Sequence, residues 1–312
     1  MKTVEISIVI PIFKCEECLV ELYSRLVGAL ECITKNFEII LIEDCGEDNS
    51  WQIIEYLSSS DKRIRGYQLS RNFGQHYAIT AGLDFSRGNW VVIMDGDLQD
   101  RPEEIPKLYA KAIEGFDIVL ALRGRRKDSY LKRVYSWGFY RVFSYLSDMK
   151  YVGDSGNFRI MSRNVVNNFC QLREQLRFLG ALVQWMGFKT TAIEVIHSER
   201  AKGVSSYTFL KLWNLASDVI VAYSDKPLRI SIKLGFLMAA GSFGYGIYFL
   251  SYALFNGIVV QGWTSLIVAL FFIGGIIISI LGIIGLYLGK TFDESKKRPL
   301  YIVARKSHNE DG

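Results

Sequence analysis

The sequence predicts an α/β fold with a mostly parallel sheet, followed by a hairpin of two membrane-spanning helices near the C-terminus. Two observations carry this prediction. Short apolar runs rich in β-branched residues alternate with helical stretches between residues 6 and 121, and no charged residue or histidine occurs from Leu234 to Leu288. Of the 312 residues, 50% are hydrophobic and 22% are charged, which excludes a disordered chain, a collagen-like chain and a disulfide-rich mini-protein.

The expected strands of the first half are continuous apolar runs at residues 6–12, 37–42, 64–69, 90–94 and 117–121. The helix expected at residues 19–33 has apolar side chains at spacings of three and four, which is the pattern of one buried face. Further helices are expected around residues 51–57, 75–85 and 102–113. Apolar strands separated by helices predict a parallel sheet that is covered on both faces.

In such a sheet, ligands bind at the carboxyl ends of the strands. Polar clusters follow the expected strands directly after Ile12, Ile42, Leu69 and Met94. We therefore expect the functional residues to gather at this edge of the sheet.

The middle of the chain combines basic and aromatic residues. Residues 130–146 and 207–223 are each expected to form an amphipathic helix, either packed on the core or lying at a membrane surface. Residues 123–141 hold seven basic side chains against one acidic side chain, so the overall net charge of +5 comes from this basic patch. The patch suits a phosphate or an anionic lipid, and a solvated helix face is the alternative. Nucleic acid is disfavoured, because the patch lies beside the expected membrane helices.

Residues 234–254 and 263–288 are each long enough to cross about 30 Å of hydrocarbon, and a buried hairpin of a soluble protein is the alternative. Arg229 and Lys233 precede this pair, and Lys290 follows it. The positive-inside rule therefore places both flanks, and with them both termini, in the cytoplasm. Glycines in both segments permit close helix packing, and so a homo-oligomer.

The sharpest chemical signal is Met94-Asp95-Gly96-Asp97-Leu98-Gln99-Asp100, at the end of the fourth strand. Two carboxylates one residue apart can reach the same cation, and Gly96 is expected to let the backbone turn tightly between them. Oxygen ligands of this kind suit Mg²⁺ or Mn²⁺, which complete their coordination with substrate phosphates. We therefore expect a divalent cation at Asp95 and Asp97.

With these segments the chain resembles family 2 glycosyltransferases of the GT-A fold. It is most similar to the branch that transfers a sugar to a polyprenyl phosphate, the dolichol-phosphate mannose synthase and bactoprenol glucosyltransferase type. The matching segments are residues 9–13, 42–44, 70–74, 94–100, 156–159 and 200–207, and the pair of apolar helices.

The resemblance implies roles for individual residues on the donor side. The side chains assigned to the nucleotide sugar are Pro11, Phe13, Asp44, Arg71, Asn72 and Asp95. The catalytic pair, Asp97 and Asp95, would hold Mg²⁺ or Mn²⁺ together with Gln99. The cation would neutralise charge as the nucleoside diphosphate leaves.

The implied acceptor is a lipid phosphate monoester, whose second pKa is about 6. It is largely ionised at neutral pH, so it needs cations for positioning more than it needs a general base. The residues assigned to the acceptor phosphate are Arg123, Lys132, Arg133, Ser136, Arg200 and Ser205.

Four segments depart from the family pattern, and the mildest departure is Gly96, where members often have alanine between the two aspartates. Lys14-Cys15 stands where members usually have Asn-Glu, and Glu43-Asp44-Cys45-Gly46 stands where they have Asp-Asp-Gly-Ser. The family sequence Gly-Asp-Phe-Arg is here Gly156-Asn157-Phe158-Arg159. Because an asparagine cannot take a proton, we expect Asn157 to have a positioning role only, and Asp154 is the nearby carboxylate that could substitute.

The implied function is metal-dependent, inverting transfer of a sugar from a nucleotide sugar, with UDP preferred, to a polyprenyl phosphate for cell-envelope glycan modification. The expected division of the chain is a nucleotide-sugar-binding core (1–125), an acceptor-binding and juxtamembrane part (126–229), two membrane helices (230–290) and a cytoplasmic tail (291–312). The protein would then be an integral protein of the cytoplasmic membrane. The diphosphate motif does not select the sugar, because selectivity depends on the shape of the pocket.

Two other functions are the alternatives. Family 2 enzymes that polymerise polysaccharides usually carry Gln-x-x-Arg-Trp, whereas this chain has Gln184-Trp185-Met186-Gly187 and two expected spans. A non-catalytic membrane scaffold is the second alternative, and the intact Asp95, Asp97 and Gln99 argue against it.

Overall fold

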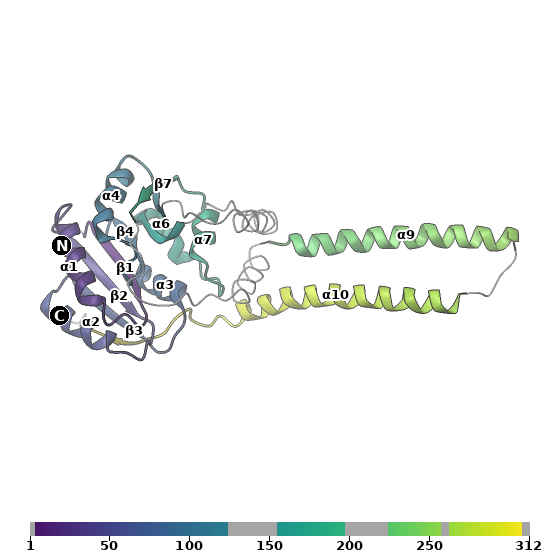
Figure 1. Cartoon of the computed structure of the whole chain (residues 1–312), viewed down its shortest axis with the longest axis horizontal. Helices are drawn as coiled ribbons and strands as arrows, with labels where there is room; N and C mark the ends of the chain where they lie inside the picture. The colour runs from purple at the N-terminus through teal and green to yellow at the C-terminus, as the bar shows by residue number, and fades with distance from the viewer. Residues whose placement is uncertain (1–3, 124–154, 197–223, 257–261, 308–312) are drawn as a thin grey trace. The chain divides into compact units, whose positions relative to one another are not determined.

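The computed structural model describes residues 4–123, 155–196, 224–256 and 262–307 (Figure 1). Contacts divide these residues into two compact units. The first comprises residues 4–123, 155–196 and 298–307, and the second comprises residues 224–256 and 262–297. The amphipathic helices expected at residues 130–146 and 207–223 lie outside the described residues, as does most of the basic patch.

The first unit is built on a sheet of eight strands in the order β7-β5-β6-β4-β1-β2-β3-β8. The strands are β1 (Ile6–Ile12), β2 (Phe37–Glu43), β3 (Ile64–Leu69), β4 (Trp90–Ile93), β5 (Ile118–Arg123), β6 (Ser155–Ser162), β7 (Thr190–Val195) and β8 (Val303–Lys306). The central strands β3, β2, β1 and β4 run parallel, because a helix connects each of them to the next along the chain.

The sheet departs from a purely parallel arrangement at two places. Strand β6 lies between β4 and β5 and runs antiparallel to both, so the fifth strand of the chain is not a neighbour of the fourth. Strand β8 pairs antiparallel with β3 at the opposite edge. The expectation of a mostly parallel sheet is therefore confirmed for the centre, whereas both flanks are mixed.

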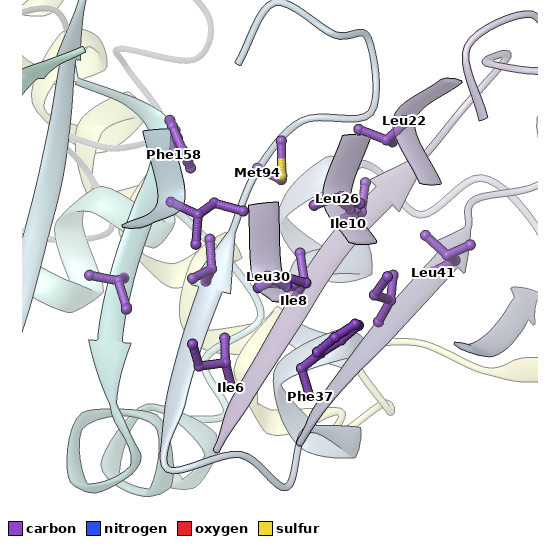
Figure 2. Close-up of a cluster of buried hydrophobic side chains, with 14 of the residues drawn as sticks. Ile6, Ile8, Ile10, Leu22, Leu26, Leu30, Phe37, Leu41, Met94 and Phe158 are labelled. Carbon is purple, nitrogen blue, oxygen red and sulfur yellow. The ribbon is translucent and has the colours of Figure 1, made fainter. Parts of the chain in front are cut away.

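Helices α1 (Leu19–Glu31), α2 (Ser50–Ser60) and α4 (Ile105–Ile113) contribute apolar side chains to one core cluster with the sheet. A single 3-10 turn, Pro102–Glu104, precedes α4 within the helix expected at residues 102–113. In Figure 2, leucines of α1 lie over isoleucines of β1, and Met94 and Phe158 extend the same cluster. Each fully buried aliphatic side chain of this kind stabilises the fold by about 1.5–3 kcal/mol.

Helices α3 (Gln75–Phe85) and α6 (Arg163–Gln171) contact each other and pack on the sheet away from that cluster, and α7 (Leu179–Trp185) follows α6. Helix α3 approaches β1 very closely, since a Cβ atom on Gly82 would clash with Cγ1 of Val9. The first residue of α3, Gln75, directly follows one of the polar clusters.

His76, the second residue of α3, is partly buried against the edge of the Phe178 ring. Within the described residues, its Nδ1 atom has no hydrogen-bond partner and is shielded from solvent. Burial, reinforced by the positive charges of Arg159 and Arg177, lowers the pKa of His76 to about 4. The imidazole is therefore neutral in the folded protein at neutral pH.

This neutral histidine predicts a pH dependence of stability. Between pH 4 and about 6.5 the unfolded chain binds a proton at His76 that the folded chain does not, so the free energy of unfolding rises with pH across this window. We expect the free energy of unfolding to be roughly 3 kcal/mol higher above this window than below it, because the difference is lost as the pH falls through it. Unfolding of the full chain in detergent at several pH values, compared with His76→Gln, should give a shallower slope for the variant, and parallel slopes would contradict the assignment.

The C-terminal residues belong to the first unit. Leu300 is buried, the Tyr301 hydroxyl donates to Asp84 over 2.7 Å, and β8 pairs with β3. Ser307 accepts a hydrogen bond from the backbone N–H of Gly66. The sequence predicts only a tail at residues 291–312, because a four-residue strand has too few residues to show a periodic pattern.

The second unit contains two long helices, α9 (Lys226–Asn256) and α10 (Trp263–Ser295). Within the described part of the chain, one helical stretch, Ala269–Ser295, has the length and apolar composition needed to cross a membrane, with a mean hydropathy of 2.7. None of its most apolar window is buried inside the protein, unlike the core helix of a soluble protein. Membrane association is supported, whereas the expected two-helix hairpin is not confirmed.

Candidate active site

The polar clusters meet at one edge of the sheet. Because β1, β2, β3 and β4 are parallel, the residues that follow Ile12, Glu43, Leu69 and Ile93 share this edge, as expected. The backbone N–H of Asp44 donates to the carbonyl of Ile12 over 2.9 Å, which ties the first two strand ends together.

The acidic turn after β4 is held by its own side chains. Asp97 Oδ1 accepts from the backbone N–H of Gln99 over 3.1 Å, and Asp100 Oδ2 accepts from the N–H of Asp95 over 3.3 Å. Leu98 is in the left-handed region, with φ of 59°. This conformation is costly for a residue with a Cβ atom, and such backbone strain is often found at functional sites.

Gly96 has a different role from the one expected. The left-handed residue of the turn is Leu98, and Gly96 instead allows close packing on β1. A Cβ atom at position 96 would lie 2.8 Å from Cδ1 of Ile12. Since that atom is the end of a flexible side chain, an alanine at position 96 would require only a small shift.

Two amide side chains contact Asp95. Gln75 Nε2 donates to Asp95 Oδ1 over 2.6 Å, and Asn157 Nδ2 donates to the same oxygen over 3.2 Å. The antiparallel register of β4 and β6 pairs Ile93 with Arg159, so Asn157 lies opposite Asp95 two residues further along. Gln75 was not among the expected site residues; its only signal in the sequence is that it follows residues 70–74.

Arg159 is a buried cation near this carboxylate. Its Nε and Nη2 atoms donate to the carbonyls of Asn157 and Gly156 over 3.1 and 2.8 Å. Burial lowers the pKa of Arg159 to about 10, an effect that the charge of Asp95 opposes. The guanidinium therefore stays protonated at neutral pH, and its bonds to backbone carbonyls stiffen the start of β6.

Asp44 is buried, and its carboxylate accepts hydrogen bonds from the backbone of the neighbouring loop. Its Oδ1 and Oδ2 atoms accept from the N–H groups of Phe73 and Gly74, each over 2.8 Å. Burial raises the pKa of Asp44, although these two hydrogen bonds oppose the change. Asp44 thereby fixes the conformation of the loop that carries Arg71 and Asn72.

The turn after β2 explains one departure from the family pattern. Cys45 occupies the position where the family pattern has glycine, and its φ of 55° lies in the left-handed region. Glycine adopts this conformation without strain, so the cysteine makes the turn less stable by about 1–2 kcal/mol. Glu43 compensates in part, because its carboxylate accepts from the N–H of Gly46 over 2.5 Å and from Gln68 over 3.0 Å.

Aromatic and cationic groups lie along the same edge. Phe13, at the end of a buried strand, is 47% exposed. The Lys14 ammonium lies 5.5 Å from its ring centroid, and the Arg71 guanidinium lies 4.2 Å from that of Phe73. Among the residues expected to bind the acceptor, Arg123 ends β5, and Lys132, Arg133, Ser136, Arg200 and Ser205 lie outside the described residues.

The donor set of the acidic turn fits an open cation site. Across the described residues, no three His, Cys, Asp or Glu side chains gather into a closed metal cage. Asp95 and Asp97 with the amide oxygen of Gln99 supply oxygen ligands only. This set matches Mg²⁺ or Mn²⁺, which bind proteins through one or two carboxylates and use substrate phosphates for the rest.

The Glycosyl transferase family 2 model matches residues 7–169, just over half of the chain. The chain belongs to glycosyltransferase family 2. The match contains the four parallel strands, the acidic turn and Asn157. The expectation of a glycosyltransferase is therefore confirmed.

Two relatives extend the similarity over nearly the whole of this glycosyltransferase. A prophage bactoprenol glucosyl transferase homolog of Escherichia coli is 37% identical over 302 residues, which cover 96% of this chain and 99% of the relative. An undecaprenyl-phosphate 4-deoxy-4-formamido-L-arabinose transferase of Shewanella sediminis is 36% identical over 302 residues, covering 96% of this chain and 91% of the relative. The similarity therefore continues beyond the family 2 match toward the C-terminus.

A solved structure supports the fold. Glucosyl-3-phosphoglycerate synthase from Mycobacterium tuberculosis, in complex with Mn²⁺, UDP and phosphoglyceric acid, aligns with a TM-score of 0.50 and 15% identity, covering 70% of this chain and 76% of that one. At this identity the likeness shows the fold alone, and the sheet of this glycosyltransferase is the Rossmann-like GT-A fold.

Proposed function

We propose that this glycosyltransferase moves a sugar from a nucleotide sugar, preferably a UDP-sugar, to a polyprenyl phosphate in the cytoplasmic membrane. The observation that carries the proposal is the acidic turn of Asp95 and Asp97 at the ligand-binding edge of a family 2 chain with an apolar helix of spanning length. The names of the two relatives, which refer to bactoprenol and undecaprenyl phosphate, support this class of acceptor.

On the donor side, we assign Asp95, Asp97 and Gln99 to a divalent cation on the diphosphate. Bound there, Mg²⁺ or Mn²⁺ would neutralise the charge that develops as the nucleoside diphosphate leaves. The self-bonded turn supports this role, because it presents the two carboxylates without rearrangement of the backbone.

For the nucleoside, the exposed ring of Phe13 offers an apolar face to the base, next to Pro11 at the end of β1. Asp44 acts through the loop that it holds, and so presents Arg71 and Asn72 to the nucleotide sugar. The guanidinium of Arg71 can donate to a phosphate or a ribose hydroxyl.

On the acceptor side, an ionised phosphate oxygen attacks the anomeric carbon as the bond from that carbon to the diphosphate breaks. The electron pair leaves with the nucleoside diphosphate, and the configuration at the sugar inverts. No proton is taken from the ionised acceptor, which agrees with Asn157 at the position of the family aspartate. We assign acceptor binding to Arg123, Lys132, Arg133, Ser136, Arg200 and Ser205.

For the membrane part, we infer two spans at residues 234–254 and 263–288, with both termini in the cytoplasm and a homo-oligomer formed through the spans. Ala269–Ser295 supports the second span. We infer four parts of the chain, at residues 1–125, 126–229, 230–290 and 291–312. Strand β8, in the last part, pairs with β3 of the sheet.

The test is mass spectrometry of the lipid product. The purified full chain in detergent is incubated with undecaprenyl phosphate, Mn²⁺ and a panel of UDP-, GDP- and dTDP-sugars. We expect one sugar to be added to the lipid phosphate with one donor class. A polysaccharide ladder, or no lipid product with any donor, would contradict the proposal.

A further inference from the structure

Three segments that are distant in the sequence converge on a single oxygen atom. Asp95 follows β4, Gln75 begins α3 and Asn157 lies in β6. Both amides donate to Oδ1 of Asp95, over 2.6 and 3.2 Å. Two donors on one oxygen restrict rotation of the carboxylate and direct cation binding toward its remaining lone pairs.

The two donors to Asp95 are neutral amides, and their neutrality affects how Asp95 can bind a cation. Amide groups donate hydrogen bonds without adding positive charge, so Asp95 keeps its full negative charge for a cation. A lysine or arginine at either position would hold the carboxylate but neutralise it. The nearby cation, Arg159, attracts Asp95 through its charge, but it donates the hydrogen bonds described above to the carbonyls of Gly156 and Asn157.

Both amides are themselves held in place. Asn157 precedes Phe158, which is 1% exposed within the core cluster, and its own carbonyl accepts from Arg159. Gln75 follows Gly74, whose backbone N–H is bonded to Asp44 and whose φ of 103° sets the direction in which α3 begins. The two donors are therefore preorganised by secondary structure on either side of Asp95.

We propose that Gln75 and Asn157 are positioning residues that orient the Asp95 carboxylate for the divalent cation of the donor complex. This inference rests on the proposed function. In this role Asn157 donates a hydrogen bond to Asp95. An ionised aspartate at position 157 could not do so, because an ionised carboxylate accepts hydrogen bonds and donates none. In this chain, position 157 thus serves the donor cation rather than deprotonation of the acceptor.

The test measures Mn²⁺ binding in the presence of UDP by electron paramagnetic resonance, on the full chain in detergent. Gln75→Met and Asn157→Leu remove each donor with little change in side-chain size and no change in charge. We expect about a tenfold weaker Mn²⁺ affinity for each variant. Because both donors serve one oxygen, the double variant should lose less than the product of the two single effects.

Matched controls separate positioning from general damage. Gln52→Met on α2 and Asn167→Leu on α6 make the same replacements at exposed positions away from Asp95, and they should leave Mn²⁺ affinity unchanged. Gln75 is exposed, so its replacement keeps the fold and leaves the inference testable even if Asn157→Leu does not fold.

The outcomes also distinguish the two proposals. Wild-type affinity for Mn²⁺ in Gln75→Met, with sugar transfer intact in the parent, would overturn the positioning role and leave the proposed function standing. No Mn²⁺ binding by the parent chain with UDP, and no lipid product, would overturn the proposed function itself.

Discussion

Asp97→Asn should abolish sugar transfer, with a fall of about 1,000-fold or more in kcat/KM for the nucleotide sugar. The replacement removes one of the two negative charges expected to hold the cation on the diphosphate, and electrostatic stabilisation of a leaving group is a large catalytic term. The asparagine side-chain oxygen can still accept from the N–H of Gln99, so the turn should keep its conformation. Transfer of a radiolabelled sugar to lipid phosphate measures the effect.

The matched control is Glu55→Gln, which removes one negative charge at an exposed position on α2. It should transfer sugar at the parental rate. Asp97→Ala removes both the charge and the bond to Gln99, so it should be at least as inactive and also less stable. Full activity of Asp97→Asn would show that the carboxylate is dispensable, and the metal assignment would be withdrawn.

Ending the chain after Lys297 should unfold or severely destabilise the first unit, although the change lies outside the family 2 match. The deletion removes β8 and exposes the edge of β3. It also removes the burial of Leu300 and the hydrogen bond from Tyr301 to Asp84. Together these losses amount to about 5 kcal/mol or more, comparable with the whole stability of many domains.

Thermal unfolding and limited proteolysis in detergent measure this effect, and two point variants calibrate it. Leu300→Ala, at a buried site, should lower the free energy of unfolding by about 2–3 kcal/mol. Ile302→Ala, at a site that is 51% exposed, should lower it by less than about 1 kcal/mol. A truncated chain that unfolds at the parental temperature would mean that β8 adds nothing to the sheet.

Much of the first unit could be predicted from local patterns. The bounds of β1, β3 and α3 are those expected from the sequence, because apolar runs and their spacing report directly on burial. The shared edge with Phe13, Asp44 and Asp95 also follows, since a parallel sheet brings the carboxyl ends of its strands together.

The partners of Asp95 could not be predicted in this way. Asn157 lies 62 residues from Asp95 and Gln75 lies 20 residues from it, and neither separation is encoded in a local pattern. The contact depends on β6 entering antiparallel beside β4, in the position where a fifth parallel strand could have been. A register shift of one residue would turn Asn157 to the other face.

By itself, the sequence determined the secondary structure of the first half, the family, the acidic turn and the apolar C-terminal region. These features arise from the order of neighbouring residues, which sets backbone preference and the periodicity of burial. Only the tertiary structure decided that two amides meet at Asp95, that Asp44 bonds to its neighbouring loop and that β8 completes the sheet. Such contacts depend on strand order and register, which follow from the packing of the whole unit rather than from any one segment.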